Sequence, residues 1–367
     1  MFRNVTPEKA IQFTRLSVAP TCCWPLPPTV TRSQLLRFKF LRSAMVLNAF
    51  ALLLPLLYAI YVHRDDPIEV AKAACLTLAV TQLLFQTSFC ITQYDRFQWL
   101  IAEMSSYCKG ASTQERHIFQ RFIDKYALFY GVSAIWFYVT ASVVVIGTLF
   151  ISQSFPTNAE YPFPIHREPI RTIIFLHQAL VGLQCAAHTC VNAFAALLLL
   201  FAAARFEILM AEQRVAANTA ELIVCVEKYC RVRRYAQEVA SAVRYIALIT
   251  VAMCGVALVL CGINCIGRQP FTVKVQFLCL AGTALLEVFM CAWPADHLLH
   301  VVSRSTWYQK PLRMQKIVLY MLVPQKPIAV TIKCVIPALS LSYYCSYISN
   351  VFSLFTALRV MMTKGDD

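Results

Sequence analysis

Two histidines in one apolar stretch are the first residues whose spacing suggests chemistry. His177 and His188 stand eleven residues apart, which on a helix places them on one face and about 16 Å apart along the axis. That distance is too long for one shared metal ion. It is conceivable for two haem ligands, but no second apolar stretch offers a matching pair. We therefore expect no haem and no metal at these histidines.

A second candidate metal site is the group Asp296, His297 and His300, whose spacing fits one face of a helix. It lies at the end of an apolar stretch and lacks a further convincing ligand, so a hydrogen-bonded or solvated patch is the better interpretation. Cys22-Cys23 and the pair Cys261 and Cys265 have no partner set for a metal, and free cysteine packs like a small apolar side chain.

Catalytic and phosphate-binding motifs are absent from the sequence. No nucleophile, base and acid stand at a spacing that indicates catalysis, and no glycine-rich loop could bind a nucleotide phosphate. The chain is therefore not expected to be an enzyme or an ATP-driven transporter, and no cofactor is predicted.

The elements that carry these residues are apolar helices. Of the 367 residues, 59% are hydrophobic and 14% are charged, and a helix of about 20 apolar residues crosses a bilayer. With only nine glycines and no alternating ten-residue pattern, a β-barrel is disfavoured. The sequence predicts an all-α membrane protein with seven transmembrane helices: Ala44–Val62, Ala73–Ile91, Ala127–Ile151, Thr172–Phe201, Tyr245–Gly267, Val275–Trp293 and Ile328–Leu358.

The positive charges predict the orientation of these spans. Most of the 33 Lys and Arg residues lie in the N-terminal segment and in the connections after the second, fourth and sixth spans. Because short loops rich in Lys and Arg remain cytoplasmic, the N-terminus is expected inside and the C-terminus outside. A G-protein-coupled receptor has the reverse orientation. The net charge of +14 then indicates attraction to the lipid bilayer and not binding of nucleic acid.

The connection between the fourth and fifth spans is expected to be helical. Residues Ala202 to Arg244 lack Gly and Pro, and apolar residues recur every three to four positions. We expect a cytoplasmic helical layer that this segment forms with the projecting ends of other spans. An amphipathic helix on the membrane surface is the alternative.

Polar side chains within the spans are few, and Glu287 is the ionisable one among them. A transporter of ions usually carries carboxylates at the membrane midplane, so this composition argues against one. The outer halves of spans two to four and six instead carry aromatic residues with a few hydroxyls and amides, which is typical of a pocket for a small, mostly apolar ligand. Plain helix packing is the alternative for any single residue.

The last apolar segment, Ile328–Leu358, contains many Ser, Asn and Thr residues. Each polar group in hydrocarbon needs a partner, so a helix facing only lipid would not carry them. A helix that lines water or packs against its own copies would. The alternative is a Ser-rich helix inside a bundle, where small residues allow close approach.

The chain resembles the insect odorant receptor family along its whole length, most specifically near its C-terminus. The residues that carry the resemblance are the sequence from Glu287 to Asp296, Trp307-Tyr308, Gln325-Lys326-Pro327 and the terminal run Ser346–Leu358. The resemblance implies an odorant-gated, non-selective cation channel, multi-pass in the plasma membrane of a sensory neuron dendrite. It also implies a heterotetramer with a shared co-receptor and activation by a small volatile odorant. The short connection Ala202–Arg244 favours a ligand-tuning subunit over the co-receptor itself.

The resemblance further implies a division of the chain and a set of site residues. The divisions are a cytoplasmic segment 1–43, helices one to six with the pocket and cytoplasmic extensions 44–300, a cytoplasmic anchor part of helix seven 301–327, and a pore-lining helix with a short extracellular tail 328–367. The implied ligand-binding residues are Leu76, Val80, Trp136, Thr140, Gln178, Gln276 and Leu280. The implied pore-lining residues are Ser353, Ala357 and Met361.

Three alternatives share parts of this pattern. A gustatory receptor would have the same topology and pore but would bind tastants, and the terminal run argues against it. A G-protein-coupled receptor would need an outside N-terminus, and Asp95-Arg96-Phe97 follows the wrong span for that class. A secondary transporter would carry substrate without large currents.

Overall fold

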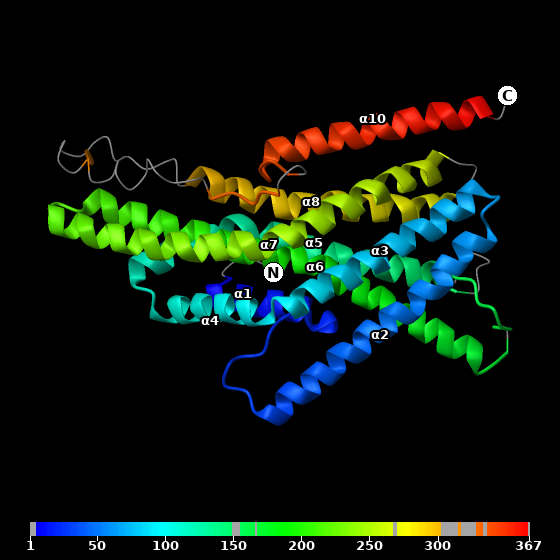
Figure 1. Cartoon of the computed structure of the whole chain (residues 1–367), viewed down its shortest axis with the longest axis horizontal. Coiled ribbons are helices and arrows are strands. Elements are labelled where there is room, and N and C mark those ends of the chain that lie inside the picture. Colours follow the sequence, from blue (N-terminus) through cyan, green and yellow to red (C-terminus); the bar gives the residue numbers. More distant parts are fainter. Residues whose placement is uncertain are drawn as a thin grey trace.

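The computed structural model describes residues 5–148, 155–165, 167–266, 270–301, 315–316, 328–332 and 336–365. A bundle of long helices forms its centre (Figure 1). The helices of the bundle are α2 (Arg32–Val62), α3 (Pro67–Thr92), α5 (Thr113–Gly147), α6 (Ile170–Val215), α7 (Thr219–Ile266) and α8 (Phe271–Val301). Each is long and apolar enough to cross a membrane. The first six predicted spans fall on these helices, so those predictions are confirmed as helices.

Helix α6 is the centre of the bundle. It contacts α2, α3, α5, α7 and α8, and 78% of its most apolar window is buried, against 22% for α2. Its middle is rich in alanine, and Ala195, Ala196 and Ala202 to Ala204 are almost fully buried. Small side chains let neighbouring helices approach closely, which compensates for the lack of a hydrophobic driving force between helices in lipid.

Side-chain caps fix where the bundle helices begin. Thr31 and Gln34 form a capping box at the start of α2, and Ser112 and Glu115 form one at the start of α5. Asp66 caps α3 by accepting from the backbone N–H groups of residues 68 and 69, with a proline in the first helical position. These caps satisfy N–H groups that have no partner inside a helix.

At one end of the molecule, helices extend beyond the bundle and pack on α4 (Tyr94–Gly110), as Figure 1 shows. The predicted helical segment Ala202 to Arg244 is the end of α6 and the beginning of α7, with a break at 216–218. Arg205 of α6 lies 3.0 Å from Glu103 and over the ring of Tyr107. Burial, followed by the hydrogen bond to Glu115, raises the pKa of Tyr107 above its usual range. The prediction that this segment is helical and packs against other helix ends is confirmed.

The N-terminal segment, for which no secondary structure was predicted, begins with a helix. It forms α1 (Pro7–Ser17), which packs on α5 and α6, followed by the short 3-10 helix η1 (Ala19–Thr21). Thr6 caps α1, and a proline opens its first turn. Val18 and Cys23 are buried in the main core. Residues 7–24 are therefore part of the folded body.

The last apolar segment is helical only in its second part. Residues 328–332 and 336–340 are not helical. Leu339 N–H donates to Val330, and Ile332 exchanges backbone hydrogen bonds with Ile336. Helix α10 runs from Leu341 to Gly365. The single continuous span Ile328–Leu358 was therefore wrong at its start, and Pro337, which cannot donate to a helix, gives the reason. The predicted anchor at 301–327 lies almost wholly outside the described residues.

Candidate functional site

A partly open cavity of about 130 Å³ lies between the helices of the bundle. All six bundle helices contribute to its wall, and the lining is almost entirely apolar. Apolar cavities with a few polar groups are where proteins bind small organic ligands. The cavity is therefore the candidate ligand site.

Most of the predicted ligand-binding residues line this cavity. Leu76, Val80, Thr140, Gln178 and Leu280 contribute to its wall, from α3, α5, α6 and α8. These positions come from the family resemblance, and the structure brings them together around one space.

The other two predicted residues lie outside the lining. The indole N–H of Trp136 donates to Thr283, 3.2 Å away, and Thr283 itself lines the cavity. Trp136 therefore supports the wall from behind. The side chain of Gln276 lies against Gly147, where its amide nitrogen occupies the space a Cβ would need. Gln276 thus joins the ends of α8 and α5 beside the cavity.

The contributions of α2 and α7 to the cavity wall were not predicted. Leu52 and Leu56 enter from α2, and Cys254 and Cys261 from α7. The sulfur of Cys261 is 3.4 Å from that of Cys75 on α3, so these cysteines join two helices across the wall. A period of three to four residues in each apolar stretch could not identify them, because every face of these stretches is apolar.

Residues 155–165, which we call the capping segment, form part of the cavity wall. Thr157 contributes to the lining, and its backbone N–H donates to Gln178, whose amide donates in turn to Tyr161. Burial, partly offset by that hydrogen bond, raises the pKa of Tyr161. The capping segment is thus bonded directly to a cavity residue.

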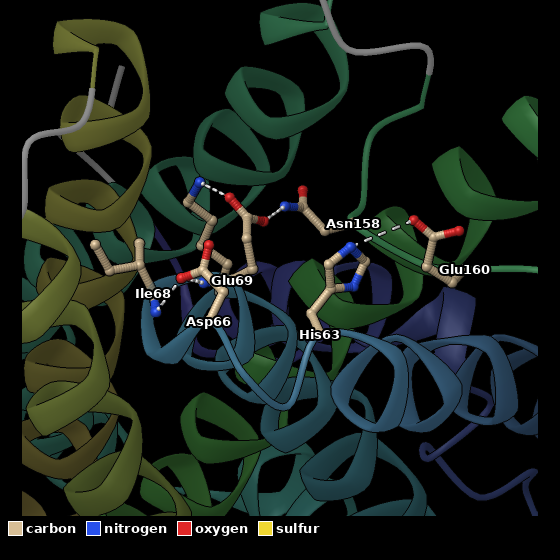
Figure 2. Close-up of polar contacts among 7 residues, drawn as sticks. His63, Asp66, Ile68, Glu69, Asn158 and Glu160 are labelled. Carbon is tan, nitrogen blue, oxygen red and sulfur yellow. Dashed lines mark hydrogen bonds and ion pairs between the residues drawn. The ribbon is translucent and has the colours of Figure 1, made fainter.

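The turn between α2 and α3 holds the other side of the capping segment (Figure 2). Asn158 donates to Glu69, 3.0 Å away, and Glu69 also accepts from Lys72 at 2.6 Å. Glu160 faces His63 at 4.0 Å. These contacts come from two elements far apart in the sequence, so they fix the capping segment over the cavity.

A buried polar network forms the floor of the cavity. Glu287 of α8 accepts from Gln82 of α3 at 2.7 Å and from Asn192 of α6 at 3.0 Å. The hydroxyl of Thr250 on α7 lies 2.9 Å from Asn192 and accepts from Gln86. All five side chains are at most 4% exposed. The network therefore connects four helices in the apolar interior, and Glu287 and Gln82 also face the cavity.

Helix α10 rests on two helices of the cavity wall. Its contacts are with α7 and α8: Tyr344 donates to a backbone carbonyl of α8, Tyr347 packs on Gly255, and Phe355 packs on Gly262. Asp296 of α8 accepts from the first N–H of α10. A helix carried by cavity-lining helices can respond to a change in the cavity.

Two of the predicted pore residues lie on the exposed side of α10. Ser353 and Ala357 are exposed, and Met361 follows one turn later in the helix. Ser342, Ser346, Ser349 and Asn350 are also exposed. A face rich in hydroxyl groups is thus left open along this helix, at the edge of the bundle (Figure 1).

Two of the histidines make contacts with other helices. His177 lies 2.9 Å from the backbone carbonyl of Asn48, and His297 lies 3.1 Å from the hydroxyl of Tyr126. Among the residues that the structure describes, no three ligands converge on a metal position. The interpretation of Asp296 as a hydrogen-bonding residue is confirmed by its bond to α10.

A second cavity, of about 450 Å³, lies under α1. It is lined by α1, α4, α5 and α6, almost entirely with apolar groups. It is larger than the first cavity, but no residue of α7 or α8 lines it, and these are the helices on which α10 rests. We therefore assign the ligand site to the smaller cavity.

Comparisons with known proteins agree with this architecture. A family model described as 7tm Odorant receptor matches residues 66–352. The fold is similar to the insect olfactory receptor OR5 from Machilis hrabei, with a TM-score of 0.78 and 13% identity over 96% of this chain and 97% of that one. The structure of the same receptor in complex with eugenol gives a TM-score of 0.78 and 12% identity over 96% and 98%. The search of curated proteins found no match.

Proposed function

Because the chain belongs to the odorant receptor family, we propose that it is the ligand-tuning subunit of an odorant-gated, non-selective cation channel. The observation that carries the proposal is the position of the cavity. Its wall includes α7 and α8, and these are the helices on which α10 rests. A ligand in the cavity can therefore act on the helix with the exposed hydroxyl face.

The proposed ligand is a small volatile molecule. The cavity is about 130 Å³ in this conformation and is lined mostly by apolar groups. The capping segment contributes Pro156 and Thr157 to its wall, so a ligand that enters from this side must pass that segment. Insect olfactory receptor OR5 has been solved in complex with eugenol, a small aromatic odorant of the kind that such a cavity would take.

The proposed mechanism is a shift of population between two arrangements. A ligand opens the channel only if it binds the open arrangement better than the closed one. Separation of α7 and α8 around a ligand would move Tyr344, Tyr347 and Phe355, and with them α10. The buried network at Glu287 holds these helices together at the floor of the cavity.

The proposed pore is formed by α10 helices from neighbouring subunits. Ser353, Ala357 and Met361 would face the central axis, since Ser353 and Ala357 are already exposed in one subunit. Helix α10 would then be the seventh span. It is long enough at 25 residues, and its polar residues distinguish it from the six apolar helices.

The proposed partners and location follow from the family. The subunit would assemble as a heterotetramer with the shared co-receptor through the segment 301–327 and the helical layer. It would lie in the plasma membrane with the N-terminus and that layer in the cytoplasm. The segment 328–367 would then hold the pore helix and the extracellular tail.

The experiment is a whole-cell current measurement with and without the co-receptor, under a panel of odorants and with G-protein signalling blocked. A fast cation current only in the co-expressing cells supports the proposal. Silence across the panel, with both proteins at the surface, contradicts it. Responses to tastants alone would favour a gustatory receptor.

A further inference from the structure

Two side chains in the cavity wall have a hydrogen-bonding atom without a partner among the described residues, the hydroxyl of Thr157 and the ring of His188. His188 of α6 lines the cavity and is 2% exposed. Its Nδ1 lies 3.0 Å from the backbone carbonyl oxygen of Cys185. A carbonyl oxygen can only accept, so Nδ1 carries the proton and donates. In the neutral ring, Nε2 is then an acceptor, and it has no partner among the residues that the structure describes.

Several donors around the cavity are in use, whereas the hydroxyl of Thr157 has no partner among the described residues. Gln82 donates to Glu287, and the amide of Gln178 donates to the capping segment. The hydroxyls of Thr189 and Thr283 donate to backbone carbonyls one turn earlier in their own helices. None of these groups donates to His188. The acceptor at Nε2 can therefore be satisfied by a molecule that brings its own donor.

A ligand without a donor would leave this atom unsatisfied. A buried acceptor that is cut off from water costs free energy, and a ligand that donates to it recovers that cost. An ether or a ketone of the same shape instead places its own lone pairs against those of Nε2. Sites built around a buried polar group distinguish strongly between ligands that do and do not pair with it.

We propose that the cavity selects small alcohols and phenols over ethers and ketones of the same shape, with Nε2 of His188 accepting the hydrogen bond from the ligand hydroxyl. This inference rests on the proposed function, because it concerns the ligand of the same cavity. It adds the chemical class of the ligand and names the residue that distinguishes it.

The test uses matched pairs of ligands on the full chain co-expressed with the co-receptor. The probes are 4-methylphenol with 4-methylanisole, and benzyl alcohol with benzyl methyl ether. Because one hydrogen bond is gained, the wild-type protein should respond to each alcohol at a concentration about tenfold lower than to its ether. His188→Phe keeps a ring of similar size and removes the acceptor, so it should abolish the difference in sensitivity between the two members of each pair.

Two further variants control for folding and for loss of a ring. His177→Phe removes a histidine from the same helix, where it bonds to a carbonyl of α2 and does not line the cavity. It should keep the preference. His188→Gln restores an acceptor oxygen and should recover part of it. If His188→Phe does not reach the surface, the preference for each alcohol over its ether is still compared between His188→Gln and the wild-type protein.

Binding is also measured without gating, as the shift in melting temperature of the purified protein with each probe. A larger shift with alcohols than with ethers, without any current, supports this inference and contradicts the proposed channel function. Currents of equal sensitivity to both members of each pair overturn the inference and leave the proposed function standing. Equal sensitivity of the wild-type protein and His188→Phe to alcohols also overturns it. If no probe produces a current or a thermal shift, both this inference and the proposed function are overturned.

Discussion

Replacement of Glu287 by leucine tests the role of the buried network. The substitution keeps a side chain of similar volume and removes the carboxyl group that accepts from Gln82 at 2.7 Å and from Asn192 at 3.0 Å. Both donors are almost fully buried, so neither can turn to water. We expect Glu287→Leu to destabilise the bundle.

The magnitude follows from the two hydrogen bonds that are lost. In membrane proteins a bond between helices contributes about 0.6 kcal/mol on average and up to about 1.7 kcal/mol, so two contribute about 1–3 kcal/mol. For a chain of 367 residues, the entropy of unfolding is about 0.8 kcal/mol/K at about 2.1 cal/mol/K per residue. The melting temperature should therefore fall by about 1–4 °C.

The assay is thermal unfolding of the purified protein in detergent. Asn264→Leu is the matched control, because Asn264 is equally buried but its amide donates to a carbonyl of its own helix. It should change the melting temperature less. In the double variant Glu287→Leu with Gln82→Leu, the loss should be smaller than the sum of the single losses, since the two side chains share one bond. A melting temperature of Glu287→Leu at or above that of the wild-type protein would refute the reasoning.

Three further changes test the wall, the capping segment and α10. Trp136→Ala should alter the ranking of ligands without loss of surface expression, because the indole supports Thr283 from behind; an unchanged ranking removes Trp136 from the site. Gln178→Leu breaks both hydrogen bonds to the capping segment. The half-maximal ligand concentration should therefore rise roughly tenfold, and currents should decay faster after washout. An unchanged decay would contradict the role of that segment. Gly262→Ala places a Cβ 2.7 Å from the ring of Phe355, so α10 must shift and the current without ligand should change; an unchanged basal current would show that α10 is not coupled to α7 at this contact.

The bundle could be predicted from the sequence because hydropathy and length determine which segments enter a bilayer. The six apolar stretches, and the helical character of Ala202 to Arg244, depend on local composition alone. Helix α1 was missed because its eleven residues carry no long apolar run. The signal was present in Thr6 and Pro7, a cap followed by a helix-initiating proline.

The site could be predicted only in part, for a physical reason. The family resemblance indicated the positions on four helices, and five of those residues face one cavity. The walls from α2 and α7 depend on how neighbouring helices are rotated, and apolar residues on every face give no information about rotation. The capping segment and the partner of Glu287 depend on contacts between residues far apart in the sequence.

The start of α10 shows the same limit on a smaller scale. By composition, Ile328–Leu358 is one apolar segment. In the structure, backbone hydrogen bonds join residue 330 to 339 and residue 332 to 336, and the helix begins only after residue 340. Ser340 then accepts from Tyr343 N–H, and Asp296 from Leu341 N–H. One of these two caps comes from another helix, so only the tertiary structure reveals it.

The most direct test of the central claim is whether α10 lines the pore that the ligand opens. Ser353→Cys, in a Cys345→Ser background that removes the exposed cysteine of α10, is treated with a charged, membrane-impermeant thiol reagent during ligand application. We predict a progressive loss of the ligand-evoked current that is much slower without ligand, and little loss for the neighbouring Leu354→Cys. Equal modification with and without ligand, or no effect on the current despite labelling of Cys at position 353, would contradict the account.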